Sequence, residues 1–284
     1  MCFGYDVEYK KIYYSLFDKN KKLQKYLEIP MSTPKMIHDF PHTAKHVVFP
    51  VNPIEFNPLN FLWGKFVFVF NPKSTSRYGV MHRHNEDPSK IMWFDLPAHC
   101  VFHFVNSWEE VNQKGETEII LFGCALDNVD LNFEVEHPFM MGQTDPKLTK
   151  FVLNLSTGNA SMEQIAPHLN VEFPTVNPRY SGKKNKFAYM GVYLESKPKT
   201  QKQKDNVNFG SFMKVDLENK KIIKRVSYGP NQRGGEVLFQ ERPNPRSEDD
   251  GYLMTYLYDI ETELSYFVVW DALTLDEVMR ARCP

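Results

Sequence analysis

The chain has 284 residues and a formal net charge of −1, with 34 lysines and arginines against 35 aspartates and glutamates. This near-neutral balance supplies no basic field for a nucleic-acid backbone, so we expect no nucleic-acid partner. The most apolar run, 61–70, is about half the length of a membrane-spanning helix, and we predict no such helix.

Residues 1–11 have neither the composition of a secretory leader nor that of a transit peptide, and they are predicted to begin inside a strand. No two cysteines form a C-x-x-C pair, which favours free thiols in a reducing compartment. We therefore expect an intracellular protein, cytoplasmic or plastid, whose N-terminus looks incomplete. The cysteines are Cys2, Cys100, Cys124 and Cys283.

Short runs rich in β-branched and aromatic residues recur along the chain, each bounded by Gly, Pro, Asn or Asp. No strong amphipathic helix interrupts them, so the sequence predicts an all-β protein. The expected strands are 65–70, 77–81, 91–94, 100–105, 118–125, 151–155, 187–193, 212–216, 221–228, 252–258 and 266–270.

Four of these strands end in an asparagine or aspartate whose side chain can bond the backbone two residues on and so begin a turn. They are Asn71, Asn154, Asp216 and Asp271, at intervals of 83, 62 and 55 residues. This uneven repeat fits the blades of a β-propeller with loop insertions. An irregular sandwich is the alternative.

Two charged segments are expected to be solvent-exposed. The lysine-rich segment 195–208 has few apolar residues and is predicted to be a solvated loop. The segment 242–251 contains the acidic run Glu248, Asp249 and Asp250, which we interpret as a solvated turn with no role in metal binding.

The segment 93–110, WFDLPAHCVFHFVNSWEE, places a histidine on a predicted strand. Strict alternation would put Val101, His103 and Val105 on one face, and Cys100, Phe102 and Phe104 on the other. A lone histidine on an apolar strand is most often a core residue satisfied by a backbone carbonyl.

Among the other histidines, His82 and His84 would share a strand face and superficially resemble a two-ligand metal site. The turn residues that follow them favour exposed side chains at a strand end. The rest lie beside prolines or in loop-like segments and are interpreted as structural. They are His42, His46, His99, His137 and His168.

Four blocks together resemble the carotenoid cleavage oxygenases, a family that includes the 9-cis-epoxycarotenoid dioxygenases. The first block is W-F-x-L-P followed by F-H-x-x-N-x-W-E-E around His103, and the second is M-I-H-D-F at His38, followed by Thr43 and Phe49. The other two are V-E-F-P-T-V-N at Glu172 and G-G-E-V-L-F-Q-E-R at Glu236. The resemblance covers essentially the whole chain.

The resemblance implies a non-haem Fe(II) dioxygenase that cleaves a double bond of a carotenoid or apocarotenoid with O₂. It implies that His38 and His103 bind Fe²⁺, and that Glu172 and Glu236 orient ligand histidines, with Glu172 serving His103. No catalytic residue beyond the ligands is expected. Four neutral imidazoles would leave Fe(II) its full charge and an open edge for O₂. The family fold is a seven-bladed propeller with iron on its axis.

Two of the four histidine blocks are missing, one ahead of Cys2 and one beyond Pro284. We therefore expect 1–284 to be a single but partial propeller domain of roughly five blades, truncated at both ends and retaining little iron. The alternative is a metal-free propeller fragment that acts as an apolar-ligand or protein-binding module without catalysis.

The segment 56–66, FNPLNFLWGKF, lacks strict alternation and is predicted to be a loop or short helix. We expect Phe61, Leu62 and Trp63 to be exposed, because an indole beside a lysine suits a bilayer interface. The resemblance places this region near the entrance for a membrane-dissolved polyene, so peripheral membrane contact is expected.

Overall fold

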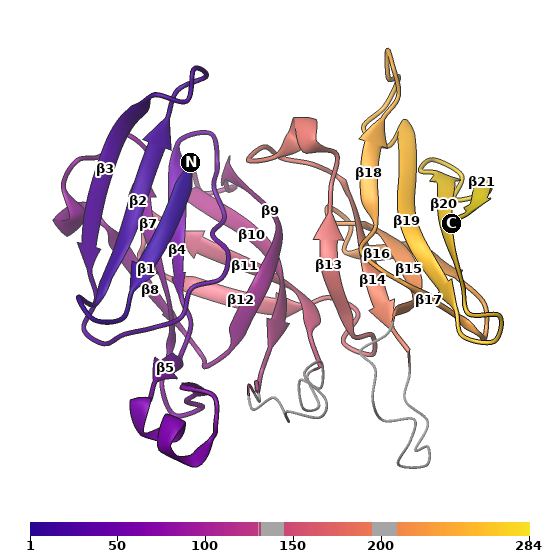
Figure 1. Ribbon diagram of the computed structural model, residues 1–284. Helices are drawn as coiled ribbons and strands as arrows, with labels where there is room; N and C mark the ends of the chain where they lie inside the picture. Colours follow the sequence, from indigo (N-terminus) through magenta and orange to yellow (C-terminus); the bar gives the residue numbers. More distant parts are fainter. Residues whose placement is uncertain (130, 132–144, 195–208) are drawn as a thin grey trace.

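The computed structural model describes residues 1–129, 131, 145–194 and 209–284 (Figure 1). Within these ranges the regular secondary structure is almost entirely β-strand, which confirms the all-β prediction. The described helices are three short 3₁₀ turns, none of them long or apolar enough to span a membrane. They are η1 (Pro58–Trp63), η2 (Pro88–Lys90) and η3 (Pro178–Tyr180).

The strands form antiparallel sheets that follow one another across the molecule in chain order (Figure 1). The first sheet contains β1 (Cys2–Asp6), β2 (Lys11–Phe17) and β3 (Leu23–Pro30). The second contains β4 (His46–Val51), β7 (Ser76–His82) and β8 (Met92–Leu96), while β5 (Ile54–Phe56) pairs with β6 (Phe68–Phe70). A four-stranded sheet follows, with β9 (Cys100–Val111), β10 (Thr117–Leu126), β11 (Lys147–Asn154) and β12 (Ala160–Gln164).

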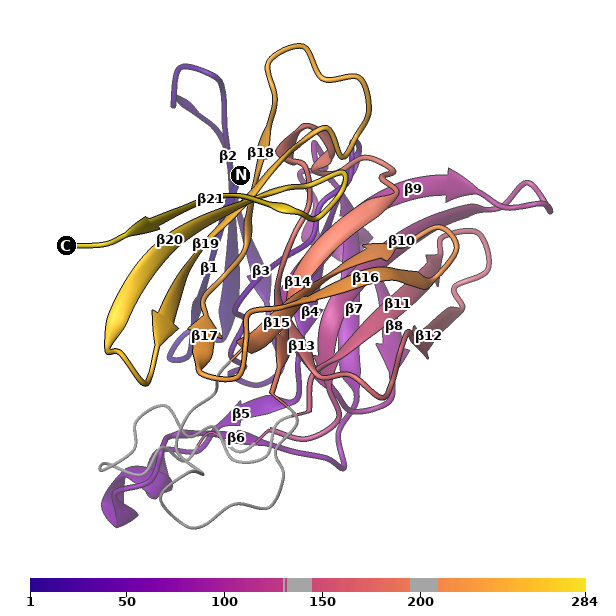
Figure 2. The ribbon, with the colours of Figure 1, turned by 90° about the vertical axis from the view of Figure 1, so that its right-hand side faces the viewer.

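The last nine strands are joined into one sheet by a single residue pair between β15 and β17, Phe209 with Gly234. Figures 1 and 2 show a group from β13 to β16 and a second group that ends at β21. The strands are β13 (Val171–Thr175), β14 (Phe187–Tyr193), β15 (Phe209–Asp216), β16 (Lys221–Ser227), β17 (Gln232–Gly234), β18 (Leu238–Glu241), β19 (Gly251–Asp259), β20 (Leu264–Asp271) and β21 (Glu277–Arg282).

The predicted turn chemistry is present. Asn71 Oδ1 accepts the N–H of Lys73, two residues on. The side chains of the other three residues of the repeat likewise accept N–H groups two or three residues on. All eleven predicted strands also occur, because their aromatic and β-branched residues form the apolar faces that the sheets bury.

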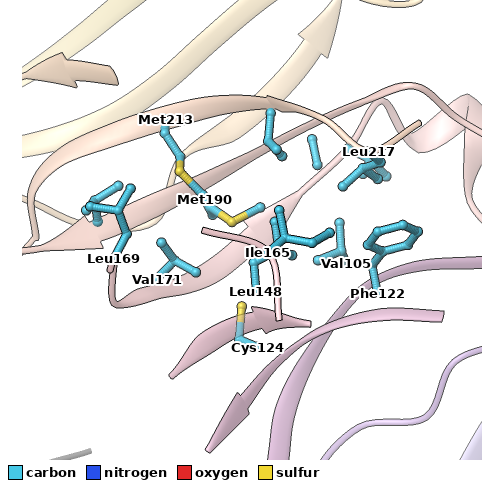
Figure 3. Close-up of a cluster of buried hydrophobic side chains, with 14 of the residues drawn as sticks. Val105, Phe122, Cys124, Leu148, Ile165, Leu169, Val171, Met190, Met213 and Leu217 are labelled. Atoms are coloured by element: carbon cyan, nitrogen blue, oxygen red, sulfur yellow. The ribbon is translucent and has the colours of Figure 1, made fainter. Parts of the chain in front are cut away.

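One buried cluster packs the four-stranded sheet against β13, β14 and β15 (Figure 3). It joins Val105 and Cys124 on one side to Val171, Met190 and Met213 on the other. These side chains are almost fully buried, so the relative position of β9 and β13 is fixed by close packing.

The strict alternation predicted for β9 is wrong, because a β-bulge interrupts it. Gly123 of β10 pairs with Phe104 and Ala125 pairs with Val101. Between these two pairs β10 advances by two residues and β9 by three, so β9 contains one extra residue. As a result Val101 and Phe104 lie on the same face and cover Gly123, where a Cβ would come within 2.9 Å of Val101 Cγ1. The extra residue re-aims the neighbouring side chains, including that of His103.

The solvated turn predicted at Glu248–Asp250 is also wrong. Asp249 and Asp250 are buried, with Lys214 Nζ 2.7 Å from Asp249 and Arg242 Nη1 2.9 Å from Asp250. Lys214 on β15 and Arg242, just after β18, thus compensate the buried carboxylates. The predicted loop 195–208 and His137 lie outside the described residues.

Candidate functional site

The fold brings His38 and His103 together from elements far apart in the sequence. His38 lies in the loop between β3 and β4, and His103 lies at the bulge of β9. Their ring centres are 5.1 Å apart and their planes are nearly perpendicular. Two imidazoles whose nitrogens each lie about 2 Å from one metal ion have a similar separation, roughly 4.5–5.5 Å.

Glu172, on β13, contacts His103 directly. Its Oε2 lies 2.7 Å from His103 Nδ1, and it also accepts the N–H of Phe173 at 2.6 Å. The carboxylate side chain is 7% exposed, whereas that of His103 is 32% exposed. With Nδ1–H donating to the carboxylate, the neutral ring keeps the lone pair of Nε2 for another partner.

The two imidazoles differ in proton affinity. Burial disfavours protonation of His103, but the hydrogen bond to Glu172 and its negative charge outweigh burial and raise the pKa above its usual value. Burial, and then the charge of His103, lower the pKa of His38. His38 is therefore neutral at pH 7, the form in which imidazole binds a metal.

Aromatic rings flank the histidine pair. The Phe102 ring centre is 5.5 Å from that of His38, and the Phe173 ring centre is 5.0 Å from that of His103. Phe209 then packs edge-on against Phe173. The histidines are thus set against an apolar wall.

Phe173 has a backbone φ of +51°, which is strained for a bulky residue and is characteristic of functional sites. This conformation accompanies the bond from its own N–H to Glu172. The sequence analysis did not identify Phe173 as a site residue. The feature of the sequence that could have identified Phe173 is its position between Glu172 and Pro174.

Asp39 is a second residue that was missed. Its Oδ2 accepts the N–H of Phe104 at 2.9 Å, and its Oδ1 accepts the N–H of Phe40 at 2.8 Å. The carboxylate therefore links the loop that carries His38 to the bulge that carries His103. The signal in the sequence was an aspartate immediately after His38.

Glu236 is exposed between β17 and β18 and forms no hydrogen bond or ion pair with a histidine of the described chain. Its negative charge contributes to the raised pKa of His103. The structure thus places Glu236 within electrostatic reach of the pair, and its role in orienting a ligand histidine stays a prediction.

In the described ranges, no group of three or more His, Cys, Asp or Glu side chains is arranged to hold a metal ion. The remaining described histidines lie elsewhere. His82 and His84 are exposed at the end of β7, as predicted. His46 bonds Glu109, and His99 is fully buried. The donor set at the candidate site is therefore the two imidazoles of His38 and His103.

The aromatic segment at η1 has the predicted exposure. Phe61, Leu62 and Trp63 are 77%, 74% and 78% exposed. Gly64, with φ +62°, ends the short helix in a left-handed conformation. Both views show η1 projecting at one end of the molecule beyond β5 (Figures 1 and 2).

Comparison with known proteins supports the resemblance. The sequence profile of the retinal pigment epithelial membrane protein (RPE65) family matches residues 1–284. A carotenoid 9,10(9′,10′)-cleavage dioxygenase of Arabidopsis thaliana is 30% identical over 96% of this chain and 50% of its own length. A chloroplastic 9-cis-epoxycarotenoid dioxygenase of the same plant is 30% identical over 95% of this chain and 44% of its own length. The chain thus spans about half the length of these relatives.

Solved structures agree on the fold. A lignostilbene dioxygenase from Pseudomonas brassicacearum superimposes with a TM-score of 0.85 at 18% identity, over 99% of this chain and 60% of that one. A cobalt-substituted apocarotenoid oxygenase from Synechocystis gives 0.81 at 23% identity, over 96% of this chain and 55% of that one. The fold matches the β-propeller of these oxygenases. The chain therefore belongs to the family of RPE65 and the carotenoid cleavage oxygenases.

Proposed function

We propose that the protein containing this chain cleaves a double bond of a carotenoid or apocarotenoid with O₂, at a non-haem Fe²⁺ site that includes His38 and His103. The carrying observation is the hydrogen bond between Glu172 and His103, made next to a second imidazole and against aromatic rings. The family of the relatives supports the same substrate class.

The residues present suit this role. Glu172 would hold the His103 ring so that Nε2 faces the metal, while His38 supplies a second neutral nitrogen. Phe102 and Phe173 would exclude water and contact the apolar polyene. The chemistry that iron supplies when bound is the activation of O₂ toward an alkene.

The proposal includes a complete seven-bladed propeller with iron on its axis and two further histidines from outside residues 1–284. Sequencing the full transcript tests this. We expect a histidine block upstream of Cys2 and an F-H-G element downstream of Pro284. If both are absent, the native protein is not such an enzyme.

The test of the site uses the full-length protein. His103→Ala should lower bound iron, measured by atomic absorption, and abolish consumption of an apocarotenoid and O₂. His84→Ala is the matched control, because His84 is exposed and lies in the turn after β7. Unchanged iron and activity in His103→Ala would contradict the proposal.

A second candidate function is a metal-free propeller fragment that binds an apolar ligand or a protein. It is favoured by the donor set, because only two imidazoles meet among the described residues and two hold Fe²⁺ more weakly than four. We expect little iron on the purified 284-residue chain. Near-stoichiometric iron that survives dialysis would eliminate this alternative.

We also propose that η1 contacts a membrane and lets the enzyme draw its water-insoluble substrate from the bilayer. Its exposed aromatic side chains beside Lys65 support this. Trp63→Glu in the full-length protein should weaken liposome binding and leave iron content unchanged. The control is Leu273→Glu, an exposed apolar position on another part of the molecule. Equal liposome binding by both variants would refute the contact.

A further inference from the structure

We propose that Asp39 is a positioning residue that sets the separation of the two imidazoles at the candidate metal site. The inference deepens the proposed function and rests on it for the role of the pair. Asp39 touches neither ring in a hydrogen bond, and it acts through the backbone that carries each ring.

The loop that carries His38 has no helix or strand of its own to hold it. On one side of His38, Ile37 is buried in the core cluster beneath β4. On the other side, the Asp39 carboxylate reaches across to β9. His38 thus lies between an apolar contact at Ile37 and a polar one at Asp39. Met36 N–H, bonded to Ile54 O, and Phe40, packed on Phe3, hold the loop on either side, but in the loop the bond from Asp39 is the one that reaches β9 beside His103.

The donor end of this link, the N–H of Phe104, lies at the β9 bulge. A bulge disrupts the ladder of interstrand hydrogen bonds, so a backbone N–H beside it needs another acceptor. Phe104 N–H finds this acceptor in Asp39 Oδ2, at 2.9 Å. A carboxylate accepting a backbone N–H makes one of the stronger kinds of protein hydrogen bond.

The register of the link explains its effect. Asp39 directly follows His38, and Phe104 directly follows His103. A single hydrogen bond therefore joins the residues adjacent to the two imidazoles, whose ring centres are 5.1 Å apart. The second carboxylate oxygen is used within the loop, on the N–H of Phe40, which fixes the Asp39 side chain itself.

Three variants of the 284-residue chain test the proposal. Asp39→Leu removes the acceptor at similar size. Asp39→Asn keeps an oxygen acceptor and removes the charge. Asp87→Leu is the matched control, because Asp87 also accepts a nearby backbone N–H, from Ser89, but caps η2 and does not contact the histidine pair in any described hydrogen bond. Asp39→Ser, whose shorter side chain loses the reach, replaces the leucine variant if that one does not fold.

The first measurement needs no metal. Nuclear Overhauser contacts between the His38 and His103 ring protons should be present in the parent, in Asp39→Asn and in Asp87→Leu, and lost in Asp39→Leu. Persistence of these contacts in the folded Asp39→Leu variant would overturn the proposal, whatever the protein binds. Their loss in Asp39→Asn would also overturn it, because the remaining amide oxygen can still accept the Phe104 N–H, and this bond would then not be what holds the rings together.

The second measurement is Co²⁺ affinity by titration calorimetry. We expect Asp39→Leu to weaken the affinity about tenfold or more, the usual effect of removing a group that orients a ligand, and Asp39→Asn to stay within about threefold of the parent. Parent-like affinity in Asp39→Leu would overturn the proposal. If the parent itself binds no Co²⁺ while the ring contacts behave as expected, the metal-binding function fails and the positioning role of Asp39 stands.

Discussion

Two histidines four residues apart, His99 and His103, show what distinguishes a scaffold imidazole from one that can bind a ligand. His99 is fully buried, with Nδ1–H donating to Pro97 O at 2.7 Å and Nε2 accepting from Tyr78 Oη at 2.7 Å. His103 uses Nδ1 on Glu172 and is one-third exposed. When both nitrogens are used inside the core, no lone pair remains for a metal or substrate.

The difference comes from the backbone as much as from the neighbours. The N–H and C=O of His99 both bond Ser76 Oγ, which holds the chain in register as β9 begins. His103 follows at the bulge, where the ladder is broken and the side chain turns toward Glu172. The same strand therefore carries a core histidine and a site histidine.

The largest expected effect separates the two residues by stability. His99→Ala should lower the free energy of unfolding by about 3 kcal/mol, because it removes a stacked buried ring and leaves Tyr78 without its partner. His103→Ala should cost roughly 1–2 kcal/mol, since Glu172 keeps its bond from Phe173. Urea unfolding measures both. If His103→Ala lost more free energy of unfolding than His99→Ala, His103 and not His99 would be the residue that stabilises the fold.

A variant with a smaller expected effect on stability, Gly123→Ala, changes the bulge alone. Gly123→Ala places a Cβ 2.9 Å from Val101 and 3.1 Å from Phe104, so the bulge must shift at a cost of about 2 kcal/mol. The His103 ring resonances should move and those of His99 should not. Gly4→Ala, where the nearest atom is 3.9 Å away, is the control for replacing a strand glycine. Equal shifts at both histidines would show that the bulge does not aim His103.

The bulge also marks where prediction from sequence stops. Strands and Asx turns depend on local side-chain chemistry, so Asn71 and the aromatic runs were predictable. A bulge depends on the partner strand, and nothing in C-V-F-H-F-V says that β10 will present Gly123 opposite it. The histidine pair itself came from the resemblance, because no spacing rule joins residues so far apart in the sequence.

The acidic run gives a second example. Asp249 and Asp250 have the composition of a solvated turn, yet both are buried, Asp249 beside Lys214 of β15 and Asp250 beside Arg242 of the same segment. Lys214 is 35 residues from Asp249 in the sequence, so the local composition does not report that this cation will compensate the buried carboxylate. Asp39 was missed for the same reason, since its acceptor role exists only once β9 is in place.

The pH dependence of stability should sharpen the comparison. Burial lowers the pKa of His99 below 6.5, so the unfolded chain takes up a proton that the folded chain does not. Stability is therefore lost as pH falls below 6.5, by up to about 1.4 kcal/mol per pH unit. His99→Gln should remove this part of the slope between about pH 7 and pH 5.5. An unchanged slope would mean that His99 is not the titrating group.

The contribution of His103 to stability should depend on pH with the opposite sign to that of His99. Glu172→Gln, the variant with the smallest expected effect, should abolish this difference between the two histidines. In the parent the pKa of His103 is raised, since Glu172 outweighs the effect of burial, so its contribution to stability is present below pH 6.5 and lost as pH rises through the raised pKa. With glutamine in place of Glu172, burial remains and the carboxylate charge is gone. The pKa of His103 should then fall below 6.5, the direction already shown by His99.

At a pH above the raised pKa of His103 both forms of the site hold a neutral imidazole, and the substituted glutamine side chain retains an oxygen to accept hydrogen bonds, so Glu172→Gln should change the free energy of unfolding by under about 1 kcal/mol there. At about pH 5.5 the variant should lose the ion pair and fall further below the parent. Nuclear magnetic resonance titration of the His103 ring measures the pKa directly, with Glu110→Gln as the control, because Glu110 accepts from Trp108 on the same strand and bonds no described histidine. A His103 pKa that stays above 6.5 in Glu172→Gln would show that another charge, such as that of Asp39 or Glu236, distinguishes the two histidines.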